Sequence, residues 1–182
     1  MISQLDKLQD NLLISLTKSL NKYNVTAFNE SVFRYFLVNE MLENGSFNNI
    51  QSELDRYDIV YQYNGKTCVL ELKFYTNPIS IYPSGLIKRK GGAGRKNFDN
   101  FQVQIEKLRE AKELSDHTVI DEKILWLFFQ SIDHNGQKTK YNIYYQRDHL
   151  KNKIPGISST RNQKRIKIND CIEFRTLLLK II

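Results

Sequence analysis

Residues 56–75, RYDIVYQYNGKTCVLELKFY, contain acidic and basic side chains whose types and spacing could bind a metal ion. Asp58 precedes one apolar run, and Glu71 and Lys73 alternate with Leu72 inside the next. A hard divalent cation such as Mg²⁺ is usually held by one or two carboxylates together with substrate phosphate. Such a metal lowers the pKa of a bound water, and a neighbouring lysine could orient that water. The stretch therefore predicts a site for phosphodiester hydrolysis.

An Asn-Gly pair between the two apolar runs predicts a β-hairpin. A two-residue type I′ turn needs positive φ at both central positions, which favours Asn64 and Gly65 there. Counting outward from that turn places Asp58 opposite Glu71, and Lys73 follows on the same face of the strand. The three charged groups should therefore converge. The alternative is an ion cluster on a solvated sheet face, which would have little effect on stability.

Helices and strands are expected on both sides of this hairpin. Leucines at helical spacing predict a helix over 4–22, and Asn29 and Asn44-Gly45 suit the two ends of a second helix. The run KILWLFFQSI is continuous and apolar, as in a strand covered on both faces. The remaining segments predict a helix over 97–115, strands over 139–147 and 164–174, and a final helical tail.

Size and composition favour one domain with a polyanionic partner. The chain has 182 residues, of which 41% are hydrophobic, enough for a single core. Lys plus Arg exceed Asp plus Glu by 27 to 20, so the net charge of +7 should attract nucleic acid, although membranes and acidic proteins would feel the same field. No apolar stretch is long enough to cross a bilayer, and we expect a cytoplasmic protein. Cys68 and Cys171 lack the spacing of a zinc site.

Two basic segments could contact a polyanion. Residues 76–97 are long for a connection and contain four of the eight glycines, so backbone amides and cations could approach phosphates there. A merely solvated charge run is the alternative. A second basic stretch, residues 138–167, could form the other wall of a DNA-binding cleft. The expected nucleic-acid-binding residues of the first segment are Lys88, Arg89, Lys90, Arg95 and Lys96.

The hairpin resembles the core of the PD-(D/E)xK nuclease superfamily, which includes restriction endonucleases, Holliday-junction resolvases and repair nucleases. Asp58 matches the first acid of that family, and Glu71-Leu72-Lys73 matches its (D/E)-x-K element. Tyr57 stands where the family name has proline, a position that varies. The resemblance covers about residues 28–147 and implies an α/β fold with a restriction-endonuclease-like core, a central mixed β-sheet flanked by helices. The basic residues 148–182 would form a C-terminal extension of this single domain.

The resemblance also implies the cofactor and further site residues. It implies that Asp58, Glu71 and Leu72 hold Mg²⁺, for which Mn²⁺ should substitute, and that Lys73 is catalytic. Family members often add a glutamate from the first helix.

Glu30 or Glu40 could supply that glutamate, and we favour Glu30 because it lies near the start of the helix. Some relatives also use a glutamine from the helix after the hairpin. Gln104 is then a candidate for contact with nucleic acid and Gln102 a weaker one; a solvent-facing role is the alternative for both.

These observations predict a Mg²⁺-dependent DNA endonuclease, either a type II restriction enzyme or a structure-specific nuclease. A chain of this size without a separate specificity domain would suit a homodimer that cuts both strands. Two other functions stay open at this stage: a nucleic-acid-binding module that has the same fold without the chemistry, and a nuclease directed at RNA.

Overall fold

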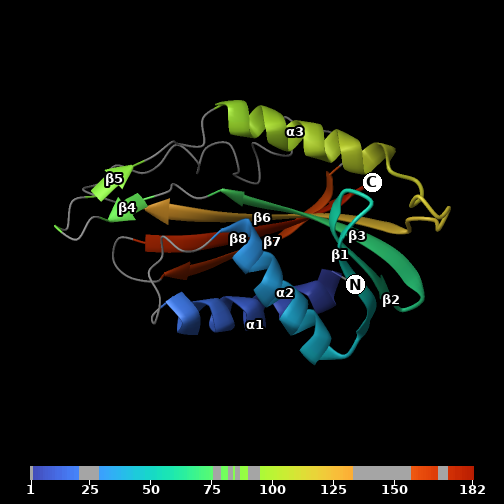
Figure 1. Ribbon diagram of the computed structural model, residues 1–182, viewed down its shortest axis with the longest axis horizontal. Coiled ribbons are helices and arrows are strands. Elements are labelled where there is room, and N and C mark those ends of the chain that lie inside the picture. Colours follow the sequence, from blue (N-terminus) through green and yellow to red (C-terminus); the bar gives the residue numbers. More distant parts are fainter. Residues whose placement is uncertain are drawn as a thin grey trace.

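The computed structural model describes residues 2–20, 29–75, 79–81, 84, 87–89, 95–132, 157–167 and 172–182. They form an α/β fold in which one mixed sheet lies between helices (Figure 1). The helices are α1 (Ile2–Leu20), α2 (Glu30–Asn44) and α3 (Arg95–Glu110). The strands are β1 (Phe47–Leu54), β2 (Tyr57–Tyr63), β3 (Lys66–Tyr75), β4 (Ile79–Ile81), β5 (Ile87–Arg89), β6 (Glu122–Ile132), β7 (Ile157–Lys167) and β8 (Ile172–Ile181).

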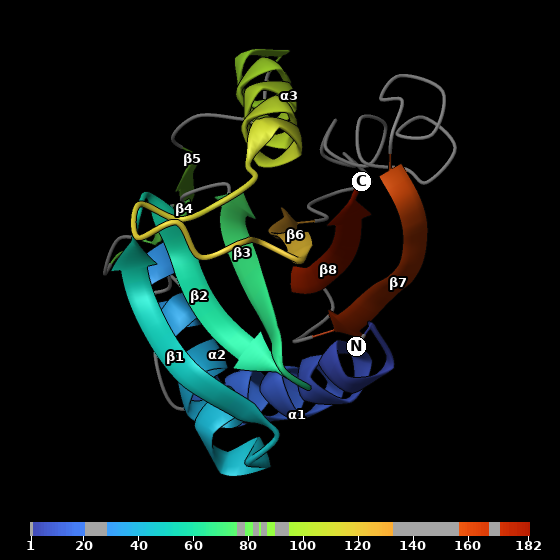
Figure 2. The same cartoon turned by 90° about the vertical axis from the view of Figure 1, so that its right-hand side faces the viewer.

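Six strands make the main sheet, in the order β1-β2-β3-β6-β8-β7. The central pair β3 and β6 is parallel, and the other neighbouring pairs are antiparallel. Helix α3 covers one face of the sheet, and α1 and α2 cover the other (Figures 1 and 2). Strands β4 and β5 form a separate two-stranded sheet beyond the end of β3 (Figure 1).

Both faces of the sheet are buried at its central strands, β3 and β6. On one face Leu70 and Trp126 pack with apolar residues of α1 and α2, among them Phe33. On the other face Val69 and Leu125 pack against α3. A strand covered on both sides has no polar face, which explains the continuous apolar run of β6 and confirms its prediction as a doubly covered strand.

The predicted limits of α2 are confirmed. The Asn29 side chain accepts a hydrogen bond from the Val32 amide (3.0 Å), and Gly45 ends the helix at φ 69°, in the left-handed region. The cap fixes where Glu30 begins the helix.

The Asn-Gly hairpin is also confirmed. Asn64 and Gly65 have φ of 50° and 74°, and Tyr63 pairs with Lys66. The predicted register follows from this turn, since Val60 pairs with Val69.

Several predictions from sequence were wrong or incomplete. The predicted helical tail is instead strand β8, which lies between β6 and β7. Part of the predicted C-terminal extension, residues 148–182, therefore belongs to the central sheet. Its apolar run is buried on both faces and therefore has neither strand nor helix periodicity. Strand β1 was not predicted, because most of its side chains are exposed and polar.

Two further predictions concern the connections. The predicted strand over 139–147 lies outside the described residues. The predicted connection 76–97 contains the β4–β5 pair and the first turn of α3, so it is partly regular structure. Among the helices of the described residues, none is long and apolar enough to cross a membrane.

Candidate active site

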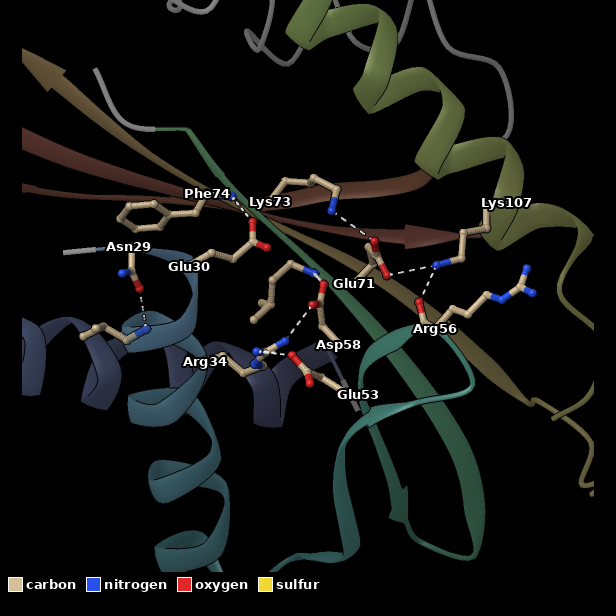
Figure 3. Close-up of polar contacts among 12 residues, drawn as sticks. Asn29, Glu30, Arg34, Glu53, Arg56, Asp58, Glu71, Lys73, Phe74 and Lys107 are labelled. Carbon is tan, nitrogen blue, oxygen red and sulfur yellow. Dashed lines mark hydrogen bonds and ion pairs between the residues drawn. The ribbon is translucent and has the colours of Figure 1, made fainter. Parts of the chain in front are cut away.

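The candidate site lies where β3 extends beyond its pairing with β2. The ladder between these strands runs from Tyr63–Lys66 to Ile59–Leu70. Beyond the ladder, two backbone amides of β3 donate hydrogen bonds to side-chain carboxylates and not to backbone carbonyls of β2 (Figure 3). The Leu72 amide donates to Asp58 Oδ2 (2.7 Å). One step further along β3, the Phe74 amide donates to Glu30 Oε2 (3.0 Å).

These two hydrogen bonds explain why acids stand at the end of the ladder. A backbone amide away from water needs an acceptor, and a carboxylate is a strong one. Asp58 and Glu30 therefore complete the hydrogen bonding of β3 where β2 no longer does. In a β-strand the carbonyl of a residue points to the same side as its amide. The Leu72 carbonyl therefore points to the side of β3 where Asp58 lies.

The predicted direct pair of Asp58 with Glu71 was wrong. The register is as predicted, but the ladder stops before these two residues. Asp58 Oδ1 accepts from Arg34 of α2 (3.1 Å), whereas Glu71 Oε2 contacts Lys107 of α3 (3.4 Å). The two carboxylates are thus held by cations from helices on opposite faces of the sheet (Figure 3). Like charges repel at close range, and separate counter-cations reduce that repulsion.

Glu71 is buried between two lysines. Its side chain is 7% exposed, Lys73 Nζ lies 3.0 Å from Oε1, and Lys107 Nζ lies 3.4 Å from Oε2. The interpretation of a solvated sheet face therefore does not hold for Glu71, because α3 covers it. A buried carboxylate needs partners for its charge, and here both oxygens have one.

Arg34 connects Asp58 to a second acid on β1. Its Nη2 lies 2.5 Å from Glu53 Oε1 and its Nη1 lies 3.1 Å from Asp58 Oδ1. Glu53 has φ 58°, an unusual conformation for a residue with a side chain. Glu53 lies near the end of β1, just before the turn that leads into β2 and Asp58. In this conformation its side chain contacts Arg34.

Glu30 shares the electrostatic field of the site. Burial, as the largest cause, raises its pKa above 4.5; nearby Asp58 and Glu71 raise it further, while Lys73 and the Phe74 amide act in the opposite direction. These four charged groups are therefore close enough to influence one another.

Glu40 lies elsewhere. Its Oε1 accepts from Ser15 Oγ at 2.5 Å, a bond between α2 and α1. Of the two glutamates considered, the structure brings Glu30 to the site.

The expected nucleic-acid-binding residues are dispersed along the chain after β3. Lys88 and Arg89 belong to β5, and Arg95 and Lys96 to the first turn of α3, whereas Lys90 lies outside the described residues. The β4–β5 pair lies beyond the end of β3 that carries the site (Figure 1).

The other expected contacts lie further from the acids. Gln104 is partly buried on α3, one turn before Lys107, and its Oε1 has no hydrogen-bond partner among the described atoms. Gln102 is also partly buried on α3. Of the second basic stretch, residues 138–156 lie outside the described residues. The rest is strand β7, which is separated from β3 by β6 and β8 and so does not adjoin Glu71.

Arg34 and Lys107 were missed by sequence reasoning. In the sequence both read as ordinary charges of amphipathic helices. A usable signal for Lys107 was its place one residue before the apolar Leu108, at the margin of the buried face of α3. Arg34 likewise follows the buried Phe33. Neither position reveals which strand the side chain reaches.

The turn between β1 and β2 is strained. Asp55 and Arg56 form its two central residues, with φ of 50° and 69°. The left-handed region costs about 1–2 kcal/mol for a residue with a Cβ, and a type I′ turn usually has glycine or asparagine there. Ser115 holds Asp55 with its amide (2.8 Å) and hydroxyl (2.6 Å), and Lys107 Nζ donates to the Arg56 carbonyl (2.5 Å).

The donor set of the site suits a hard divalent cation. Among the described residues, no three His, Cys, Asp or Glu side chains converge closely enough to hold a metal by themselves. Mg²⁺ commonly has only one or two protein carboxylates, with water and substrate phosphate as its other ligands. Asp58, Glu71 and the Leu72 carbonyl supply oxygen ligands of that kind. The chemistry of these donors therefore suits Mg²⁺. The metal would compete with Arg34 for Asp58 and with Lys107 for Glu71.

Comparisons of the chain with family models, with curated proteins and with solved structures found no match.

Proposed function

We propose that the chain is a Mg²⁺-dependent endonuclease that hydrolyses DNA phosphodiester bonds and has a restriction-endonuclease-like core. One observation carries the proposal. Glu30, Asp58 and Glu71, with Lys73, gather at the point where the β2–β3 ladder ends, and two of these acids bind the amides of β3. Carboxylates can hold a divalent metal ion, and a lysine beside them can orient a water bound to that ion, which suits metal-assisted phosphodiester hydrolysis.

Each side chain has a defined part in this proposal. Asp58, Glu71 and the Leu72 carbonyl would hold Mg²⁺, or Mn²⁺ in its place. When bound, the metal supplies a water of lowered pKa and offsets charge on the phosphate. Lys73 Nζ, 3.0 Å from Glu71, is the group that orients the attacking water. Glu30, whose pKa burial raises, can accept a proton at a higher pH than an exposed glutamate.

The net charge of +7 and the basic residues beyond β3 support DNA as the substrate. A homodimer that cuts both strands is part of the proposal. Light scattering of the protein on duplex DNA tests that part, and a monomer on DNA would refute it.

The central experiment is plasmid nicking in Mg²⁺ and in EDTA. Asp58→Asn keeps an oxygen that can accept from the Leu72 amide, and Lys73→Met keeps the length of the side chain. Both variants should fold and should lose activity by at least about 100-fold, a usual effect of removing a group that acts in the transition state. Glu43→Gln and Lys112→Met change exposed charges and serve as matched controls. Full activity in either site variant would refute its assignment.

A second candidate is a DNA-binding module without catalysis. The observation in its favour is that Asp58 and Glu71 already have cationic partners, so the ion-pair network is complete without a metal. DNA binding with no nicking in Mg²⁺ or Mn²⁺ would support this module. A parallel panel of RNA substrates tests the remaining alternative, an RNA-directed nuclease.

A further inference from the structure

An open hollow adjoins the candidate site on the side of Glu71 that faces Lys107. Its volume is about 450 Å³, and its lining comes from the β1–β2 turn, the start of β2, α3 and the segment after α3. The lining residues are Asp55, Arg56, Tyr57, Lys107, Glu113 and Ser115. Lys107 belongs both to this hollow and to the ion pair with Glu71, so the hollow and the candidate site share a wall.

Lys107 is held in place before any ligand binds. Its Nζ lies 2.5 Å from the Arg56 carbonyl, 3.4 Å from Glu71 Oε2 and 5.0 Å from the centre of the Tyr57 ring. An ammonium group has three N–H donors, and the two oxygens use two of them. The side chain is 33% exposed, so the third donor is open to a ligand in the hollow. A donor fixed in advance loses little conformational entropy when it binds.

Arg56 provides a second cation at the same place. The side chain is exposed and has no ion-pair partner among the described residues. Its φ of 69° is costly for arginine and natural for glycine, yet arginine occupies the position. The backbone carbonyl of Arg56 is held by Lys107, but the strained residue carries a side chain with no ion pair in the described part of the fold, which indicates a role toward a ligand. The guanidinium forms paired hydrogen bonds with phosphate oxygens, which suits that role.

The acids of the hollow already have partners. Both oxygens of Asp55 accept from Ser115, and these hydrogen bonds lower the pKa of Asp55. Glu113 lies 3.3 Å from His117 Nδ1. The two cations, by contrast, have donors left for a ligand. The hollow therefore favours an anion at its Lys107 and Arg56 side.

We propose that this hollow is a phosphate subsite for the DNA strand, in which Lys107 and Arg56 bind the phosphate next to the one at Glu71 and Lys73. The inference rests on the proposed function. Glu71 lies between the two lysines, with Lys73 at Oε1 and Lys107 at Oε2. A DNA strand with one phosphate at Lys73 would continue past Glu71 and bring its next phosphate to Lys107.

The test measures binding of a labelled DNA duplex by anisotropy in EDTA, over a range of salt concentrations. Each phosphate contact contributes about 0.9 to the slope of log affinity against log salt. Lys107→Met and Arg56→Gly should each lower the slope by about 0.9. Lys7→Met, an exposed position on α1 on the other face of the sheet, should leave it unchanged.

Arg56→Gly separates binding from folding, because glycine relieves the strained φ. The variant should melt at the same temperature as the parent protein or higher, and still bind DNA more weakly. Lys107→Met has a second readout of opposite sign. Removal of a cation beside Glu71 should tighten Mg²⁺ binding by about threefold to tenfold while DNA binding weakens. A purely structural lysine would weaken both.

The outcomes distinguish the subsite from the nuclease proposal. An unchanged salt slope in Lys107→Met and Arg56→Gly overturns the subsite, even if the parent protein nicks plasmid in Mg²⁺. Lower slopes in both variants support the subsite, even if the parent protein binds DNA without nicking it. A parent protein that binds no DNA in EDTA overturns the subsite, and the nicking assay then decides the proposed activity separately.

Discussion

Replacement of Arg34 by methionine tests whether a protein cation occupies the place of the metal. Arg34 reaches Asp58 and Glu53 from α2, and the side chains of Arg34 and Asp58 are only 18% and 15% exposed. Methionine keeps a long apolar stem and a high helix propensity, so the change removes the charge and its hydrogen bonds with little effect on α2 itself. Asp58 then has the Leu72 amide as its remaining partner among the hydrogen bonds described above.

The size of the effect follows from the two ion pairs. A hydrogen bond to a charged group in a partly buried pair contributes about 1.5–3 kcal/mol. The pair with Glu53 contributes about 0.5 kcal/mol or less, because the Glu53 side chain is 70% exposed. Arg34→Met should therefore lower the free energy of unfolding in EDTA by about 2 kcal/mol, which is a fall in Tm of roughly 4–8 °C for a chain of this length.

Mg²⁺ should offset part of this loss. A ligand that binds only the folded state raises its stability in proportion to the logarithm of concentration over Kd. If the metal replaces the Arg34 charge at Asp58, affinity should be about tenfold tighter in the variant, an extra 1.4 kcal/mol at saturation. Thermal unfolding in EDTA and in excess Mg²⁺ measures both quantities. Glu53→Gln, which removes only the exposed pair, is the control and should change stability by about 0.5 kcal/mol or less.

Equal stabilisation of the variant and the parent protein by Mg²⁺ would refute this reasoning. It would mean that Arg34 and the metal do not compete at Asp58. The site would then have to bind metal away from that carboxylate, or not at all.

Three other changes test the fold around the site. Because burial raises the pKa of Glu30 above 4.5, the stability linked to its protonation is present below that pH and is lost as pH rises through the folded pKa; Glu30→Gln should therefore stabilise the protein at about pH 8 but not near pH 4, by urea unfolding. Gly65→Ala should cost about 1 kcal/mol in the same assay, purely from its φ of 74°, since an added Cβ meets no atom within 4 Å; an unchanged midpoint would contradict the turn. Thr176→Val should cost about 2–4 kcal/mol, because Gln9 and Trp126 both donate to its hydroxyl in the core, and a neutral result would show that this bond does not matter.

Local signals in the sequence were sufficient for the elements that begin and end at special residues. Asn29 and Gly45 delimit α2, and Asn64-Gly65 sets the turn and the register of β2 and β3, because each depends on backbone geometry within a few residues. The same signals could not predict β1 and β8. The exposed β1 lacks an apolar pattern, and β8 is buried on both faces, so its pattern has no period.

The sequence by itself determined which acids and which lysine belong to one hairpin, since a two-residue turn leaves a single register for Asp58, Glu71 and Lys73. Only the tertiary structure decided how these groups are held. The ladder ends before the acids face each other, so Asp58 is held by Arg34 and Glu71 by Lys107. These cations come from helices 24 and 36 residues away in sequence, on opposite faces of the sheet. Their reach depends on how the helices pack, which the pattern of a single helix does not contain.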